Sequence, residues 1–266
     1  MAATETAICN LALQRMGQAV IDDIDGTSVN EVKCANIFDQ VRDETLLDGP
    51  ELGWKFSKRT YHSIDREEFT ITAFTSASAT TTTVTATHTL VAGDMVTIDG
   101  TTSYDGDYVV NSVSTTVSFV ITATFVADDA TGTAYWTSNE YAYRYAVPTC
   151  KKVVAVKVGG LDIPDWVRWG DYILTNNESA EVDMDIIKAL TTTVTSWPDW
   201  FVRIVVLRMA IELHYSMTQD LKAIQLLAEE LWRAKAKAIA MDEREKYVQE
   251  SSNSWADIGH TQETIK

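Results

Sequence analysis

The chain has 266 residues, of which 45% are hydrophobic and 23% are charged, so it has ordinary globular composition and is longer than one typical domain. Its formal net charge of -16 argues against a nucleic-acid-binding protein, because phosphate binding requires clustered Lys and Arg. The negative charge has a second interpretation, which is that it only keeps the protein soluble.

Cys9, Cys34 and Cys150 are far apart and lack C-x-x-C spacing, so neither a disulfide framework nor a thiolate zinc site is indicated, and a reducing compartment suits them.

The apolar stretches are too short to cross a membrane. The best one, residues 201–213, is interrupted by Arg203, Arg208 and Glu212, whereas a bilayer requires about 20 apolar residues. The first residues contain no basic segment followed by an apolar run, so we expect no signal peptide. We therefore expect a soluble protein.

The first predicted elements are two helices. Thr4 is the expected N-cap of the first helix, and Gly17 its expected end. Ser28 and Glu31 form the S-x-x-E pattern of a capping box for the second helix, which we expect to end at residues 49–50, Gly-Pro.

An acidic turn joins these helices. Asp22, Asp23 and Asp25 suggest a calcium loop, but Ile21 and Val32 occupy two of the positions where that motif needs acidic ligands. We therefore interpret the segment as a solvated turn, whose negative charge lies near a helix N-terminus.

The composition changes sharply near Phe69. From there to Thr137 there is no Lys or Arg, and Thr and Val alternate with apolar residues as half-buried strands do, for example in 69–72 and 95–98. Gly-Asp and Asp-Gly pairs at 93–94, 99–100 and 105–106 predict turns. Residues 67–137 are therefore predicted to form a small all-β barrel or sandwich, inserted into a helical chain.

Further strands are predicted after the insertion, over 153–158, 172–174 and 182–190. The last of these alternates Val182, Met184 and Ile186 with Asp183 and Asp185, although Ile186-Ile187 also leaves a helix open.

Two long helices are predicted at the end of the chain. Ser196 is the expected N-cap of the first, with Pro198 in the first turn, and residues 201–215 are apolar on most sides. Asp220 is the expected cap of an amphipathic helix that runs to about Gln249. Its predicted apolar face consists of Leu221, Ile224, Leu227, Ala228, Leu231 and Ala238.

The fold class predicted from these elements is α+β. The helical core domain comprises residues 1–66 and 138–249, with an N-terminal helix pair, two long C-terminal helices and short strands. The inserted domain comprises 67–137, and the polar tail, 250–266, is expected to be disordered or ordered only by a partner.

No catalytic, cofactor or metal site is predicted. His62, His88, His214 and His260 are the only histidines, and none lies in a recognisable nucleophile motif or at H-x-x-x-H spacing. His214, on an apolar helix, is expected to be a packing residue. The many carboxylates allow no specific pair to be chosen, so we expect no enzyme.

Aromatic residues are the more informative group. Trp166, Trp169 and Tyr172 cluster in one region, and such residues usually belong to a core or an interface between subunits. Trp255 stands in the polar tail, where a large apolar side chain usually requires a pocket on another molecule.

Five segments of the chain occur in a characteristic order: Ala7-Ile8-Cys9-Asn10-Leu11-Ala12-Leu13, Gly53-Trp54-Lys55-Phe56-Ser57-Lys58-Arg59, Tyr143-Arg144-Tyr145-Ala146-Val147-Pro148, Tyr172-Ile173-Leu174-Thr175-Asn176 and Trp197-Pro198-Asp199-Trp200-Phe201-Val202. These segments and their order resemble the tail tubular protein A family of podovirus head-to-tail adaptors. The insertion resembles a small β module of phage virion proteins, with the pattern H-x-L-x-x-G-D-x-V-x-I-x-G, here His88 to Gly100.

The resemblance implies a structural virion protein. It would form a homo-oligomer, a dodecameric ring in the family, between the portal protein and the tail nozzle protein in the viral tail, after assembly in the host cytoplasm. Double-stranded DNA would pass through its acidic channel without specific binding. In such adaptors the C-terminal helix and tail engage the portal, so Tyr247, Trp255 and Ile258 are the portal-docking candidates.

An alternative function is a tail protein whose insertion recognises a host glycan or anchors a tail fibre. Its candidate surface residues are Tyr104, Tyr108 and Trp136, which would have to be exposed for that function and buried in a barrel core. We expect most of them to be buried.

Overall fold

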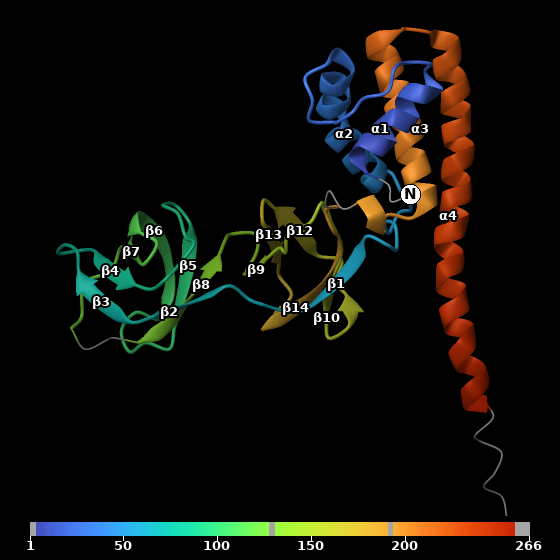
Figure 1. Cartoon of the computed structure of the whole chain (residues 1–266). Helices are drawn as coiled ribbons and strands as arrows, with labels where there is room; N and C mark the ends of the chain where they lie inside the picture. The colour runs from blue at the N-terminus through green and yellow to red at the C-terminus, as the bar shows by residue number, and fades with distance from the viewer. Residues whose placement is uncertain (1–3, 128–130, 191–193, 259–266) are drawn as a thin grey trace, which may run out of the picture. The chain divides into compact units, whose positions relative to one another are not determined.

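The computed structural model describes residues 4–127, 131–190 and 194–258 (Figure 1). The chain divides into two compact units. One comprises Met1–Arg59 with Ile187–Lys266 and is called the helical unit below, and the other comprises Thr60–Ile186 and is called the β unit. Helices and mostly antiparallel sheets occur in separate parts of the chain, so the fold class is α+β, as predicted. Among the described residues, no helix is both long enough and apolar enough to cross a membrane.

The helical unit is built around one helix, α3. Its helices are α1 (Glu5–Arg15), α2 (Val29–Leu47), α3 (Asp199–Met217) and α4 (Leu221–Ile258), with a short 3₁₀ turn, η1 (Val194–Ser196). Helices α1, α2 and α4 all pack against α3. Nine residues of α3 are buried, which agrees with the predicted apolar helix: Phe201, Ile204, Val205, Val206, Leu207, Met209, Ala210, Leu213 and His214.

Local capping explains where most of these helices begin. The Thr4 hydroxyl accepts a hydrogen bond from the Ala7 amide, and both bonds of the Ser28–Glu31 capping box are present, as predicted. The N-cap predicted at Ser196 is wrong. Ser196 ends the 3₁₀ turn, and the N-cap of α3 is Pro198, which offers no side-chain cap.

An aromatic cluster lies where α3 begins. The rings of Trp54 and Trp200 are 5.0 Å apart, and those of Phe56 and Phe201 are 4.9 Å apart. Trp54 is fully buried and donates a hydrogen bond from Nε1 to the Thr45 carbonyl. Two segments far apart in the sequence are thus joined by ring packing, which contributes about 0.5–1.5 kcal/mol per pair beyond burial of area.

The β unit contains a seven-stranded sheet that is nearly closed. Its order is β2-β8-β5-β6-β7-β4-β3, and the two end strands, β2 and β3, follow each other directly in the sequence. The chain therefore turns at Thr72 from one edge of the sheet to the other. The strands are β2 (Glu68–Ile71), β3 (Ala73–Ser76), β4 (Thr82–Thr85), β5 (Met95–Asp99), β6 (Gly106–Thr115), β7 (Ser118–Ile121) and β8 (Gly132–Thr137).

Two smaller sheets complete the β unit. One has the order β1-β14-β10-β11, and the other has the order β12-β13-β9. Their strands are β1 (Lys58–Asp65), β9 (Tyr143–Ala146), β10 (Lys152–Val158), β11 (Leu161–Asp162), β12 (Trp166–Trp169), β13 (Tyr172–Thr175) and β14 (Glu181–Ile187). A helix was the alternative to the strand predicted over 182–190. Residues 182–187 belong to strand β14 and form no helix.

The division into units differs from the predicted domains. Residues 138–186 were assigned to the helical core by sequence, whereas the structure groups them with the insertion. The reason is packing, because Leu174 of β13 belongs to the core of the seven-stranded sheet and Tyr172 packs against it. Helix α4 also continues to Ile258, beyond the end predicted at about Gln249. Residues 259–266 of the predicted tail lie outside the described residues.

Gly53 offers a test of the packing in the helical unit. It has φ +78°, and a Cβ there would lie 2.6 Å from Cδ1 of the buried Ile187. Gly17 in the same unit has φ +67° and nothing within 4 Å of such a Cβ.

We therefore expect Gly53→Ala to lower the free energy of unfolding by about 1–3 kcal/mol more than Gly17→Ala, since both carry the backbone strain and only one carries the clash. Urea unfolding followed by circular dichroism measures the difference. Equal losses for the two variants would contradict the crowding at Gly53.

Candidate functional site

Helix α4 packs one side against the rest of the helical unit, and its other sides are exposed. Ile224, Leu227, Ala238 and Asp242 are buried and lie at spacings that place them on one side of the helix. Most remaining residues between 221 and 244 are exposed. They include two strips on different sides of the helix, one basic and one apolar, which together make up the candidate site.

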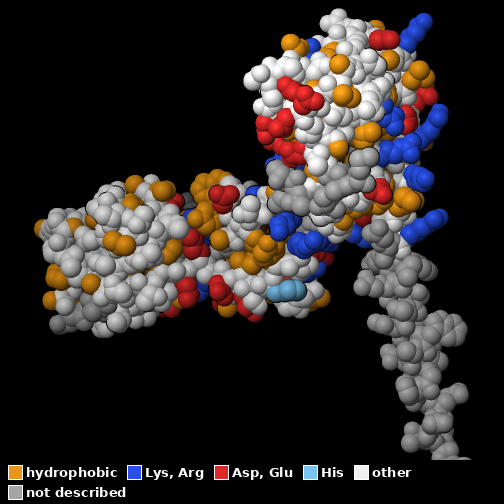
Figure 2. All heavy atoms as spheres, in the orientation of Figure 1, with side chains coloured by type: hydrophobic (Ala, Val, Ile, Leu, Met, Phe, Trp, Pro, Cys, Tyr) orange, Lys and Arg blue, Asp and Glu red, His pale blue; other side chains and the backbone are white. Residues whose placement is uncertain are grey.

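The basic strip consists of Lys222, Arg233, Lys237 and Arg244. All four side chains are exposed, and their spacing keeps them on one side of the helix. Its first and last residues are 22 positions apart, which corresponds to roughly 33 Å at 1.5 Å per residue. Figure 2 shows Lys and Arg side chains in a row along the edge of α4. An acidic protein thus concentrates exposed positive charge on one helix.

The apolar strip consists of Leu221, Ala228 and Trp232. Leu221 is 67% exposed and Trp232 is 73% exposed, and residues spaced by seven and four lie on the same side of a helix. Trp is enriched among the residues that contribute most to binding between proteins. An apolar strip beside charged residues has the composition of a protein interface, with an apolar centre and a charged rim.

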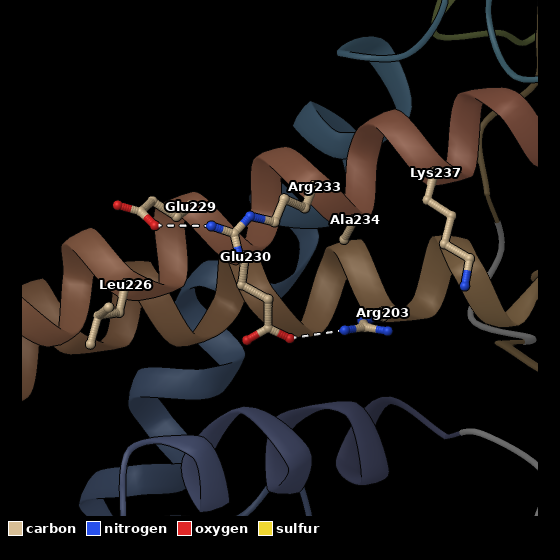
Figure 3. Close-up of a pocket in the computed structure, with 7 residues that line it drawn as sticks. All are labelled: Arg203, Leu226, Glu229, Glu230, Arg233, Ala234 and Lys237. Atoms are coloured by element: carbon tan, nitrogen blue, oxygen red, sulfur yellow. Dashed lines mark hydrogen bonds and ion pairs between the residues drawn. The ribbon is translucent and has the colours of Figure 1, made fainter.

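Ion pairs hold α4 in place along its length. Glu230 accepts from Arg15 of α1 at 2.9 Å. It also accepts from Arg203 of α3 at 3.0 Å, and Figure 3 shows this second contact. Asp48, the residue after α2, pairs with Arg208 of α3 and with Lys235 of α4. One helix is therefore tied to the other three.

A third tie lies further along α4. The buried Asp242 carboxylate accepts from the Lys55 amide at 3.1 Å, and the Lys55 ammonium donates to the Asp242 carbonyl at 2.7 Å. The helix is thus fixed at Glu230, Lys235 and Asp242, so both strips are held on a rigid support. A rigid support lowers the entropic cost of binding a partner.

A shallow groove of ≈ 510 Å³ lies between α3 and α4. Figure 3 shows Leu226, Glu230 and Lys237 of α4 on the side that faces Arg203 of α3. Glu229, Arg233 and Ala234 complete its lining, and Glu229 pairs with Arg233 at 3.4 Å. The groove adjoins the basic strip, with which it shares two cations.

The pKa of Glu230 reflects these contacts. Partial burial acts to raise it, but the hydrogen bonds from Arg203 and Arg15 outweigh burial and hold the pKa of this carboxyl below its usual value. Glu230 is therefore charged at neutral pH and contributes its ion pairs there.

The portal-docking candidates lie on the last turns of α4. The helix includes Tyr247, Trp255 and Ile258, but the side chains of these residues lie outside the described part of the structure. Their predicted role stays a prediction.

The aromatic candidates of the insertion are largely buried. Tyr104 is 1% exposed and stacks on Phe74 at 4.2 Å, and Trp136 is 5% exposed. Tyr108 is partly buried and packs against the same core. The expected burial is therefore observed, and these rings do not form an exposed platform on which a glycan could stack.

Sequence reasoning missed the apolar strip. Leu221 and Ala228 were assigned to the buried face of α4, but both are exposed, and Trp232 was not selected at all. The spacing of Trp232 from Ile224 and Leu227 places it away from the buried side. This angular offset from the buried side was the feature of the sequence that could have identified Trp232 as exposed.

Two of the histidines have packing roles. His214 is buried and its Nδ1 lies 2.6 Å from the Thr218 hydroxyl, as expected for a packing residue. His88 is buried between Phe69 and Phe119 and accepts from the Leu90 amide through Nδ1. Within the described ranges, no group of three or more His, Cys, Asp or Glu side chains could hold a metal ion.

A buried ion pair joins the insertion to strand β9. Arg144 of β9 is 3% exposed and pairs with Glu67, and it also donates to the Thr89 hydroxyl at 3.0 Å. Its guanidinium lies over the rings of Trp136 and Tyr172 at 4.8 and 4.3 Å. These partners leave it enclosed by protein, so its role is structural.

No protein-family model matches the chain, and no curated protein matches it significantly.

Glu230 offers a test of how α4 is held. We expect Glu230→Gln to destabilise the protein at pH 7 by up to about 1 kcal/mol, since partly exposed ion pairs are screened by solvent. Because the folded-state pKa is lowered, the ionic contribution is present above the unfolded value and is lost as pH falls through the folded one. The difference from the parent chain should therefore shrink when urea unfolding is repeated near pH 4.

Glu229→Gln is the matched control, because Glu229 is exposed and pairs only with Arg233 one turn away on the same helix among the described residues. We expect Glu229→Gln to lower the free energy of unfolding by about half a kcal/mol or less. If the two variants behaved alike at both pH values, Glu230 would not anchor the helix.

Proposed function

We propose that this chain is a structural subunit of a bacteriophage tail, a head-to-tail adaptor whose copies form a ring between the portal protein and the tail nozzle protein. The observation that carries the proposal is the exposed apolar strip of α4, with Trp232 73% exposed on a helix fixed at three points. Exposed apolar surface rimmed by charge is typical of a surface that another protein covers.

The length of α4 also supports the proposal. Helix α4 has 38 residues and α3 has 19, which correspond to about 57 Å and 28 Å. The two are consecutive and pack against each other, so the final turns of α4 extend past the end of α3 (Figure 1). We assign these turns, with Tyr247, Trp255 and Ile258, to the contact with the portal.

Two of the five segments that resemble the adaptor family pack together in this chain. The segment 53–59 supplies Trp54 and Phe56, the segment 197–202 supplies Trp197 and Phe201, and their rings form one cluster. Similarity in two distant motifs supports a family resemblance more strongly when their residues contact each other, because packing then constrains both sets of side chains together. The helical unit is on this proposal the adaptor core, formed by the N-terminal helix pair and the two long C-terminal helices.

The charge distribution suits a channel for DNA. The β unit contains 17 Asp or Glu and six Lys or Arg, and residues 67–137 contain eight Asp or Glu and no Lys or Arg. Such a surface repels phosphates, so DNA would pass without binding. The proposal includes no catalytic step and no cofactor, and it places the protein in the virion tail.

Trp232 provides the test of assembly. We expect the purified chain, alone or mixed with its portal protein, to form rings that are visible by electron microscopy and measurable by native mass spectrometry. Trp232→Ala should reduce assembly by roughly tenfold or more in affinity, as truncation of a central interface Trp does.

Val29→Ala is the control, because Val29 is 71% exposed at the start of α2. It should assemble like the parent chain. A chain that stayed monomeric beside the portal, or that turned over a substrate, would contradict the proposed function.

A further inference from the structure

Most cations of the basic strip of α4 have no ion-pair partner among the described residues. Arg233 pairs with Glu229, whereas Lys222, Lys237 and Arg244 have no ion-pair partner within 4 Å among the described residues. Arg233 and Lys237 are one helical turn apart, so their side chains start from positions about 6 Å from each other. The strip is therefore ready to bind a closely spaced group of negative charges.

The inserted module carries such a group. Asp99 ends β5, and Asp105 and Asp107 flank Gly106, the first residue of β6, which pairs with Ile98. All three side chains are exposed. They gather at one end of the β5-β6 hairpin, where Asp107 lies opposite Thr97 and Asp99 follows the last paired residue of β5, Ile98. We call them the acidic end of the module.

The charge at this end is not neutralised by the module itself. Asp105 accepts from the amide and hydroxyl of Thr101, both at 2.8 Å, and Asp107 accepts from the Thr97 hydroxyl at 2.6 Å. These donors are neutral, and residues 67–137 contain no Lys or Arg. Like charges on neighbouring strands repel each other, so a cationic partner would stabilise the hairpin.

We propose that the basic strip of one copy docks on the acidic end of the inserted module of the next copy. The inference rests on the proposed ring, and it identifies the surfaces that join the neighbouring subunits. Each copy has one strip and one acidic end, so the contact is head-to-tail, and such contacts close into rings when the rotation permits. The insertion then has a role, which is to brace the adjacent subunit.

A second copy fits the strip better than the other candidates. The chain itself supplies a complementary acidic surface in equal number, and a second copy carries charges of both signs, whereas a nucleic acid is negative along its whole length and would also meet the many carboxylates of this chain.

Charge reversal on both sides tests the docking. One variant carries Arg233→Glu and Lys237→Glu, and the other carries Asp99→Lys and Asp107→Lys, which leaves Asp105 to hold its loop. We expect each alone to associate roughly tenfold more weakly than the parent chain in sedimentation velocity, and an equimolar mixture of the two to recover association. In the mixture every strip meets an end of opposite charge.

Two controls accompany these variants. Lys152→Glu with Lys188→Glu changes the net charge equally at exposed positions outside the strip, and it should stay within about twofold of the parent. Parent association should also weaken between 50 and 500 mM salt, because screening shortens the range of charge interactions. The Asp99→Lys, Asp107→Lys variant could fail to fold, which circular dichroism would reveal. In that case the Arg233→Glu, Lys237→Glu variant and the salt series still test the docking.

The outcomes separate this docking from the proposed function. Rings that form equally well with Arg233→Glu and Lys237→Glu would overturn the docking and leave the ring standing. A change in monomer shape alone, or a loss of portal or duplex DNA binding with self-association intact, would overturn it in favour of another partner. A parent chain that formed neither rings nor a portal complex would remove the proposed function itself.

Discussion

The burial of α3 on nearly all sides is the constraint on which the helical unit depends. Nine of its 19 residues are buried, and α1, α2 and α4 each cover part of it. Because α4 needs only one side to cover α3, the rest of a long helix stays exposed. The ties at Glu230, Lys235 and Asp242 then fix which sides face outward. An ordinary core requirement thereby produces a rigid surface with an apolar and a basic strip.

The sequence predicts local features of this fold well. Thr4 and the Ser28–Glu31 pair act through bonds between residues three positions apart, so their roles can be read directly. The strand predicted over 153–158 is present as β10, since a run rich in Val favours an extended chain. The periodicity of apolar residues shows which side of a helix is apolar, but not how far the packing partner extends over that side. Leu221 and Ala228 were therefore assigned to the buried face, although both are exposed.

Features that depend on distant pairing could not be predicted in the same way. In the nearly closed seven-stranded sheet, the consecutive strands β2 and β3 occupy opposite edges, and no local pattern records that arrangement. The Glu230 bridge joins Arg15 and Arg203, which are 188 positions apart in the chain. The candidate site consists of residues that the core leaves out, so it becomes visible only when the packing partners of α4 are known.

Arg144 has a consequence for any attempt to shorten the protein. Its guanidinium belongs to β9, yet Glu67, Thr89 and Trp136, which neutralise and enclose it, all come from residues 67–137. Excising that segment at its sequence boundaries would remove the counter-ion of Arg144 together with the side chains that cover it, and would uncover Tyr172, which packs against the core of the seven-stranded sheet. The insertion and strand β9 therefore share one set of contacts, and a trimmed chain would need new polar residues where β9 and β13 become exposed.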